Sequence, residues 1–487
     1  MSWITHLNKE TLIKARYFNN ELTFEEIPES ECTNIKNLWD TLREDYSDWV
    51  ANVRLENFDD KNNVVNYFQW KGMSTWWLNS LTFKDIEFDN KWINRLMVIY
   101  LTKHYLTSII IETDDKVICR CIKNNFSNYN VIYVRSVNTS FKDKLKHNVF
   151  GVNLYLYLLL IRSFLLRLEI YLLFLGEKKK IFNPANEKTR IWFRSTYPAN
   201  WVLDEGELKD RHIRNIHLFD KKFNLSSSYL MYIMRYGKDK NLNFFSLRNK
   251  VKSLKNIIGR EVIFPESYIK LYDLFETYYS TFIEYLKFSK LKKTIYFKNL
   301  FKINGIDFSD ILIEEWKNNY FSKLQYNKLH GLAMIRFLEH CKSSQIIVSY
   351  GEFYNQSRYA YFAAKKINPN NMFIAYQHAS NSKNLMSSNF RKNEINTNNF
   401  PETINYMPTP DYFLVQGEQY KSILKEFYSK ERIRVIGSLK NDGFTDLKNE
   451  WWSIKRKIEK KYNLLSKNLI LLAPSLNDSI HILNGLS

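Results

Sequence analysis

The amino-acid sequence predicts an α/β fold made of parallel-sheet domains with helical insertions. Short apolar runs recur between residues 345 and 437, and a helical pattern or a turn follows each run. Strands of a parallel sheet give this pattern, because helices cover both of their faces. Polar side chains stand just past the ends of these runs. In open α/β sheets this edge is where ligands bind.

An N-terminal α/β region is predicted at residues 1–140. A strand pair within residues 2–30 precedes a helical stretch around Cys32–Val53. The run SIIIET is then followed by the helical pattern DDKVICRCIKNNF and by the run VIYVRS. A strand, an aspartate-capped helix and a second strand in this order form a βαβ unit.

A helical insert is predicted at residues 141–181, and Val149–Gly176 is its most apolar part. This segment is long enough to span a bilayer. Arg162 lies near its centre, however, and a central charge costs about 2.5–3.5 kcal/mol on insertion. Basic residues flank the segment on both sides, which favours contact with a membrane surface. A buried core helix, a helix in the membrane plane and a true span all stay open.

The remainder of the first Rossmann-like domain is assigned to residues 182–400. The runs IWFRSTYP and SYLMYIMRY predict strands, and long helical patterns occupy about 244–340. The loop after the first of these strands carries aromatic and charged side chains, Tyr197, Trp201, Asp210 and Arg211. Such a set either lines a cleft, with Tyr197 and Trp201 as substrate-binding candidates, or belongs to an ordinary polar loop.

A tryptophan pair, Trp76 and Trp77, follows Lys71 and Ser74 in the N-terminal region. Paired indoles beside a hydroxyl and a cation can form a sugar-stacking wall, which makes both tryptophans substrate-binding candidates. Such pairs are also common among core aromatics, so a purely structural role is the competing interpretation.

The main set of candidate site residues surrounds two predicted strands, QIIVS and MFIAY. Glu352 follows the first strand, shortly before a predicted helix at Ser357–Lys366. A carboxylate there acts as general base, holds sugar hydroxyls or stabilises the helix start. His378 follows the second strand and suits proton transfer or contact with a phosphate or sugar oxygen. Glu352 and His378 are the catalytic candidates, and the substrate-binding candidates beside them are Asn355, Gln356, Arg358, Gln377 and Ser380.

Charge and motifs argue against several functional classes. The formal charge is +20, but the lysines are scattered along the chain, so we predict no nucleic-acid binding. The sequence contains no phosphate loop, strand-anchored dinucleotide-binding pattern, nucleophile elbow or metal-ligand spacing. We therefore expect neither a metal nor a cofactor.

Cysteine usage and the N-terminus indicate the compartment. Of the four cysteines, the close pair Cys119 and Cys121 fits neither a redox nor a zinc motif. Reduced, buried thiols are typical of cytoplasmic proteins. The first residues also lack a signal-peptide pattern. We expect a cytoplasmic protein, either free or at the cytoplasmic face of the inner membrane.

The later part of the chain resembles a known family through residues at successive strand ends: Glu352, Gln377-His378, Pro410-Asp411, Gly417 and Gly437-Ser438-Leu439. In this order they resemble the bacterial surface carbohydrate (O-antigen) biosynthesis family, which is GT-B glycosyltransferase-like. The resemblance is specific over about residues 340–445. Weaker similarity extends to capsule Kdo transferases and CDP-glycerol glycerophosphotransferases. Ala379 departs from the pattern, because related proteins often carry glycine there.

The resemblance implies two Rossmann-like domains facing a cleft, with the acceptor held mainly by the first and a nucleotide-sugar donor by the second. Residues 401–487 would contain a linker and the start of the second domain, which we expect to be truncated. The donor-binding candidates are Gly437, Ser438 and Ser475. The implied partners are a nucleotide sugar, which is a substrate rather than a cofactor, and a lipid-linked saccharide.

These expectations combine into a functional hypothesis. The chain is expected to be a glycosyltransferase of surface polysaccharide biosynthesis (O-antigen, lipopolysaccharide or capsule) that transfers a sugar to a lipid-linked acceptor. Peripheral membrane contact through residues 149–176 fits that role. The truncation keeps two alternatives open, an inactive form of the enzyme and a non-catalytic carbohydrate-binding or scaffold protein of the same pathway.

Overall fold

A computed structural model gives the fold of the chain as two compact units, Met1–Gly437 and Ser438–Ser487. In the second unit, short helical pieces lie at 452–453, 455–457 and 459–461. The residues that the structure describes are 13–18, 21–59, 61–84, 91–106, 109–127, 132–133, 149–177, 190–204, 207–213, 226–235, 241–257, 261–350, 354–378, 389–395, 404–438, 452–453, 455–457 and 459–461.

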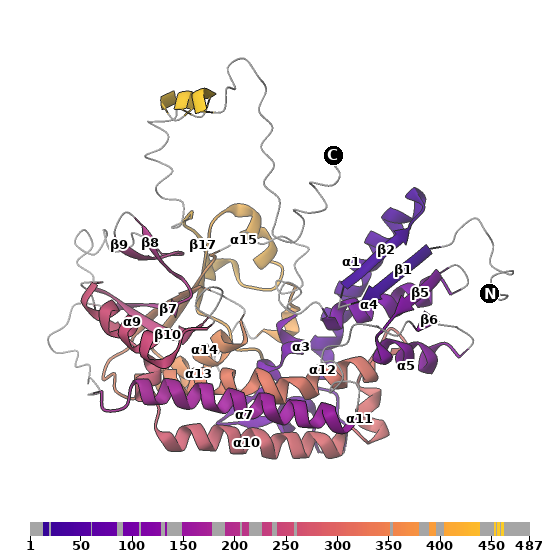
Figure 1. Cartoon of the computed structure of the whole chain (residues 1–487), viewed down its shortest axis with the longest axis horizontal. Coiled ribbons are helices and arrows are strands. Elements are labelled where there is room, and N and C mark those ends of the chain that lie inside the picture. Colours follow the sequence, from indigo (N-terminus) through magenta and orange to yellow (C-terminus); the bar gives the residue numbers. More distant parts are fainter. Residues whose placement is uncertain are drawn as a thin grey trace. The chain divides into compact units, whose positions relative to one another are not determined.

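A parallel sheet organises the first unit (Figure 1). Among the described residues it has seven strands in the order β11-β10-β7-β14-β15-β16-β17, and all neighbouring pairs are parallel. The strand order therefore runs outward from β7 in both directions, as in Rossmann-like folds, and the predicted α/β class is confirmed. The strands are β7 (Arg190–Pro198), β10 (Ser226–Met234), β11 (Val262–Ile263), β14 (Ile346–Tyr350), β15 (Met372–Tyr376), β16 (Tyr412–Val415) and β17 (Ile433–Val435).

Both faces of strand β7 are covered, because the consecutive residues from Trp192 to Ser195 are all buried. Helix α13 (Leu324–Leu338) covers one face, where Trp192 packs edge-on against Phe337 with ring centroids 5.2 Å apart. Helix α9 (Phe244–Ile257) covers the other face, where the Tyr197 hydroxyl donates to the Lys250 carbonyl at 3.3 Å. The apolar run that predicted this strand is therefore explained by burial on both sides.

Helix α14 (Asn355–Ile367) packs tightly on α13. A Cβ atom placed on Gly331 of α13 would lie 2.2 Å from ring atoms of Tyr359 on α14. Because no side chain fits in that space, glycine allows the two helices to approach this closely. The contact holds α14 against the element that covers the sheet.

A second sheet belongs to the N-terminal region and has the order β2-β1-β5-β6. Its strands are β1 (Ile13–Phe18), β2 (Glu21–Glu26), β5 (Ile109–Thr113) and β6 (Ile132–Tyr133). Helix α5 (Lys116–Asn125) joins the parallel strands β5 and β6, and Asp115 caps it by accepting from the Val117 amide at 2.8 Å. The predicted strand pair and βαβ unit are confirmed. The helices beside this sheet are α1 (Glu29–Val53) and α4 (Lys91–His104).

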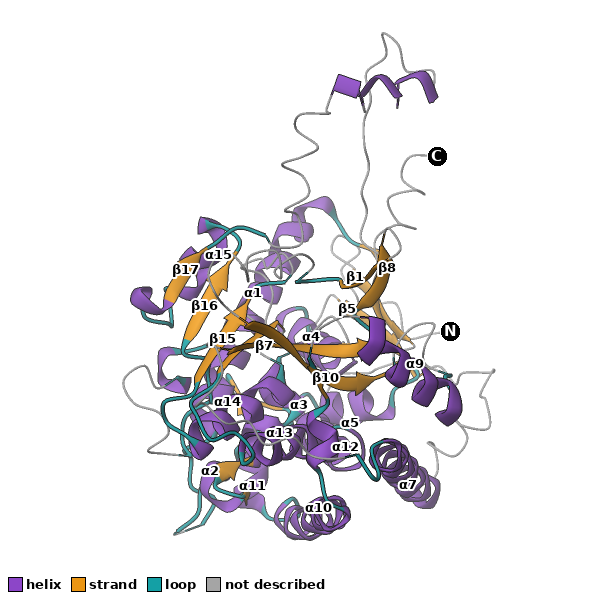
Figure 2. Cartoon of the chain, turned by 90° about the vertical axis from the view of Figure 1, so that its left-hand side faces the viewer, coloured by secondary structure: helices purple, strands orange, loops and turns teal. Residues whose placement is uncertain are grey.

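The predicted apolar insert forms helix α7 (Val149–Leu173), which lies beside α10 (Leu271–Leu291) and α12 (Ser309–Ser322) in both views (Figures 1 and 2). Ser163 of α7 hydrogen-bonds Tyr278 of α10 at 2.8 Å. One side of α7 is buried, while several of its leucines are exposed. Within the described residues, no helix combines the length and the apolar run that crossing a membrane requires.

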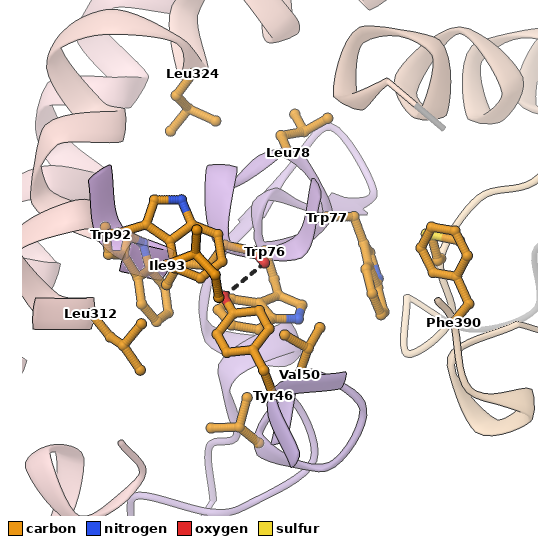
Figure 3. Close-up of a cluster of buried hydrophobic side chains, with 14 of the residues drawn as sticks. Tyr46, Val50, Trp76, Trp77, Leu78, Trp92, Ile93, Leu312, Leu324 and Phe390 are labelled. Carbon is orange, nitrogen blue, oxygen red and sulfur yellow. Dashed lines mark hydrogen bonds between the residues drawn. The ribbon is translucent and has the colours of Figure 1, made fainter. Parts of the chain in front are cut away.

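The core of the N-terminal region is rich in aromatic side chains (Figure 3). Trp76 lies against Trp49 and Trp316, with ring centroids 6.2 and 5.1 Å away. The shorter elements around this core are α2 (Val64–Tyr67), β3 (Gln69–Trp70), β4 (Met73–Ser74), the 3-10 turn η1 (Thr75–Leu78), α3 (Ser80–Phe83), and, from later in the chain, α11 (Ile295–Asn299), β12 (Lys302–Ile303) and β13 (Ile306–Asp307).

The boundary between the units differs from the one expected at residue 401. Strands β16 and β17 follow the predicted linker, yet they pair with β15 and extend the sheet of the first unit. Helix α15 (Glu418–Leu424) connects them. The first unit therefore continues to Gly437.

Candidate active site

The strand order reverses between β7 and β14, and their carboxyl ends mark the position where such sheets bind ligands. Side chains alternate along a strand, so Arg194 and Ser195 of β7 point to opposite faces. Ser195 meets residues from β14 and from a hairpin of β8 (Trp201–Asp204) and β9 (Glu207–Asp210). These elements build a polar cluster at the carboxyl edge.

Asp210 is the buried acid of this cluster. Its carboxylate accepts the Ser195 hydroxyl and the backbone amides of His212 and Ile213, the amides at 2.7 and 3.1 Å. Burial raises the pKa of Asp210 to about 6, although these hydrogen bonds favour the ionised form. The carboxylate therefore holds the chain that carries His212 and exchanges its proton within the range of mildly acidic pH.

The Tyr350 hydroxyl, at the end of β14, joins the strands of the cluster. It lies 3.1 Å from the Ser195 hydroxyl and accepts from the Thr196 amide at 3.0 Å. The Asn200 side-chain amide donates to the same oxygen at 2.5 Å. Burial raises the pKa of Tyr350 to about 12, so the phenol stays protonated at neutral pH. The cluster is therefore fixed in geometry around one buried hydroxyl.

Two half-buried imidazoles, His212 and His378, lie beside this network. Their ring centroids are 5.0 Å apart, and the His212 ring lies 4.6 Å from that of Tyr350. His378 follows β15, and Tyr354 at the start of α14 lies 6.3 Å from it. Imidazole is the side chain best suited to proton exchange near neutral pH. The arrangement can accept a proton from a hydroxyl or donate hydrogen bonds to an anionic oxygen.

Several predicted binding residues have structural partners in the described part of the chain. Arg358 is buried and donates to the Trp77 carbonyl at 3.1 Å and to the Thr82 hydroxyl at 2.8 Å. Asn355 donates to the carbonyls of Leu78 and Asn79. Both side chains therefore connect α14 to the tryptophan segment rather than facing the carboxyl edge.

Trp76 and Trp77 have no exposed surface in the structure (Figure 3). The Trp77 indole donates to the Ile404 carbonyl at 3.2 Å. Stacking on a sugar needs an accessible ring face, which neither residue offers here. The pair forms part of the aromatic core, as the competing interpretation of the sequence has it.

The remaining predicted residues have various positions. Gln377 accepts from the Gln416 amide at 2.8 Å and so continues the contact between β15 and β16, while Gln356 is half-buried on α14. Trp201 donates to the Ser195 hydroxyl at 3.1 Å, which brings it into the cluster. Tyr197 is tied to α9 instead. Residues that lie outside the described part of the chain are Glu352, Ser380 and Ser475.

The donor-binding candidates Gly437 and Ser438 follow β17. Gly437 has a φ of +80°, a backbone conformation that strongly favours glycine. Ser438 is the first residue of the second unit. Gly437 thus ends the sheet-bearing unit with a turn that other residues adopt only under strain.

Four members of the cluster, Ser195, Asn200, His212 and Tyr350, were not among the sequence candidates. Asn200, His212 and Tyr350 follow predicted strands, the same signal that selected His378, whereas Ser195 lies within a predicted strand. Asp210 was noted only as one of a mixed set in that loop. A lone polar residue in a loop carries little information until the fold brings it beside others.

Among the described residues, no group of His, Cys, Asp and Glu has the arrangement of a metal site. No protein-family profile, curated protein or solved structure matches this chain. The carboxyl-edge cluster, defined as Ser195, Asn200, Asp210, His212, Tyr350 and His378, is therefore judged by its own chemistry.

Proposed function

We propose that this chain is a GT-B-type glycosyltransferase of surface polysaccharide biosynthesis, which transfers a sugar from a nucleotide sugar to a lipid-linked saccharide. The observation that carries the proposal is the pair His212 and His378 beside buried Asp210, at the point where the strand order reverses. Ligands of open α/β sheets bind there, and sugar transfer needs a group that takes a proton from the acceptor.

The roles of the residues follow from their exposure. His212 and His378 are half-buried, so one of them can reach an acceptor hydroxyl and take its proton as the oxygen attacks the anomeric carbon. The nucleotide leaves with the electrons of the bond it loses. Asp210 is a positioning residue, because its carboxylate binds the backbone that carries His212. Tyr350 holds Ser195 and Asn200 in place beneath the imidazoles.

The order of strand-end residues supports the sugar as the transferred group, because it resembles the surface carbohydrate family over about residues 340–445. In that arrangement the first unit binds the acceptor and a second Rossmann-like domain binds the donor. The carboxyl-edge cluster would then be the acceptor-binding site. Glu352 stays a candidate base.

Turnover of the purified chain tests the proposal. It is incubated with a panel of nucleotide sugars and a lipid extract of bacterial membranes, and nucleotide release and sugar incorporation into lipid are measured. We expect His378→Ala or His212→Ala to lower turnover by about 10²–10⁴-fold, the usual contribution of a general acid or base.

His340→Ala is the matched control. Its imidazole is also half-buried, but it follows α13 and packs on Tyr268 before β14 begins. Turnover of this variant should equal that of the unsubstituted chain. Unchanged turnover in both His212→Ala and His378→Ala would refute the assignment, and donor binding without any transfer would favour the carbohydrate-binding alternative.

A further inference from the structure

The helices α7 and α10 both expose apolar side chains, and we name the surface that these side chains form the α7–α10 face. On α7 it includes Leu158, Ile161 and Leu165, whose residues are 51, 55 and 57% exposed. On α10 it includes Tyr272, Phe275 and Tyr279, which are 69, 54 and 68% exposed. Both triplets have the spacing i, i+3, i+7, so each lies on one side of its helix.

The two helices are neighbours. The rings of Phe164 on α7 and Phe275 on α10 have centroids 5.5 Å apart, and Ser163 bonds Tyr278. Figures 1 and 2 both show α7 and α10 side by side, on the far side of α12 and α13 from the sheet. The exposed triplets therefore belong to one surface, remote from the carboxyl-edge cluster.

The composition of this face is unlike that of a helix that faces water. Among the described side chains within the two helices, every exposed one is apolar or aromatic except Arg162, Lys287 and Lys290. A helix on a soluble surface carries polar residues on its outer side. Here the outer side is apolar, and the only exposed charges on it, among the described residues, are positive.

The carboxylates of α7 and α10 form ion pairs with basic side chains. On α10, Asp273, Glu276 and Glu284 pair with Arg336, Lys71 and Lys328, at 2.6, 2.7 and 3.0 Å. On α7, Glu169 pairs with Arg235 at 2.5 Å. The negative charges of these helices are thus neutralised within the fold, whereas Arg162, Lys287 and Lys290 are exposed.

We infer that the α7–α10 face docks on an anionic lipid bilayer, with both helices lying in the plane of the membrane. Exposed apolar patches of this kind mark interaction surfaces. Tyrosines such as Tyr272 and Tyr279 suit the boundary between lipid and water. The exposed cations, and the formal charge of +20, complement anionic headgroups.

A second copy of the chain is a poorer occupant. In a two-fold contact the same patch faces itself, so the cations of one copy would approach those of the other. A lipid surface supplies the opposite charge instead. The inference is independent of the proposed sugar transfer, because it uses a different surface and needs no catalysis.

Sedimentation of the full chain with vesicles tests this inference. Vesicles of phosphatidylcholine alone are compared with vesicles that also contain phosphatidylglycerol. We expect strong binding only to the anionic vesicles. Leu158→Asp and Tyr279→Asp should each weaken it by about tenfold or more, because each removes an exposed apolar side chain that lipid would bury. Lys287→Ala should weaken it by about fivefold.

Leu106→Asp is the matched control, because Leu106 is an exposed leucine, 46% accessible, that follows α4 outside this face. It should bind vesicles like the unsubstituted chain. Circular dichroism checks that each variant is folded. Equal binding to both vesicle types, or full binding by Leu158→Asp, would overturn the inference. A dimer in solution that Tyr279→Asp converts to a monomer would also overturn it, since the face would then be covered by a second copy.

Discussion

Two histidine-containing clusters lie on opposite faces of β7, and they differ in access to solvent. At the carboxyl edge, beside Ser195, the rings of His212 and His378 are half-buried. On the other face, Arg194 contacts the His330 ring nitrogen at 2.5 Å, and that ring is only 3% exposed. Burial, together with nearby arginines, holds the pKa of His330 well below its ordinary value. The cluster around Arg194 and His330, which we name the inner cluster, therefore cannot exchange protons with a ligand.

A carboxylic acid accompanies each cluster. Burial raises the pKa of Glu266 to about 7 on the inner side and that of Asp210 to about 6 at the edge. Glu266 lines a cavity of about 30 Å³ together with Arg167 and His330. That volume holds about one or two waters. A raised pKa of an acid therefore does not by itself identify a site: of the two clusters, only the one at the carboxyl edge has half-buried imidazoles beside its acid.

The largest expected effect is on the free energy of unfolding, through a substitution in the inner cluster. Arg194→Ala should lower the free energy of unfolding by about 3–5 kcal/mol, because it removes the hydrogen bonds of a buried guanidinium to Ser349, Ser357 and His330. Ser195→Ala, at the edge, should cost about 1–3 kcal/mol. Urea denaturation measures both values. Equal losses would mean that the two clusters contribute alike to the fold.

The second-largest expected effect is on the pH dependence of stability, through Glu266. Its pKa is raised from 4.5 to about 7, so the folded state keeps a proton that the unfolded state has released. Stability from this group is full below about pH 4.5 and declines until about pH 7, by about 3 kcal/mol. Glu266→Gln should remove this contribution, so that unfolding curves recorded from pH 4 to pH 8 show a decline about 3 kcal/mol smaller than in the unsubstituted chain. A decline of unchanged size in the variant would contradict the assignment.

The smallest effect is that of Asp210, whose pKa rises from 3.8 to about 6. The stability that Asp210 contributes also declines as the pH rises. The decline lies between about pH 4 and pH 6 and amounts to about 2–3 kcal/mol. Asp210→Asn should remove this contribution and leave the decline between about pH 6 and pH 7, which belongs to Glu266. If the variant lost the decline between pH 6 and pH 7 instead, the two acids would have been assigned to the wrong clusters.

Local patterns predicted the strands and their carboxyl edge correctly. The runs QIIVS and MFIAY are apolar because β14 is buried on both faces and β15 is buried on one face and half-buried on the other. His378 could be placed at the edge for the same reason. No local pattern predicts that the β8–β9 hairpin brings Asp210 and His212 to Tyr350. His212 and Tyr350 are in contact although they are more than a hundred positions apart in the sequence.

Arg358 illustrates what strand-end position cannot decide. It stands in the first turn of α14, where an anion-binding role is chemically reasonable, yet its guanidinium donates to Trp77 and Thr82. Those partners are 281 and 276 positions away in the chain. The direction of a side chain at a helix start depends on what packs against it. The sequence around Arg358 does not show that the segment containing Trp76 and Trp77 packs there.

The most direct test of the central claim is the nuclear magnetic resonance of labelled histidine side chains in the full chain. Signals are assigned with single His→Ala variants, and a nucleotide sugar and a saccharide acceptor are then added. If the carboxyl edge binds substrate, the signals of His212 and His378 will shift, while those of His330 and His340 stay in place. Shifts at His330 or His340 without any change at His212 and His378 would contradict the account.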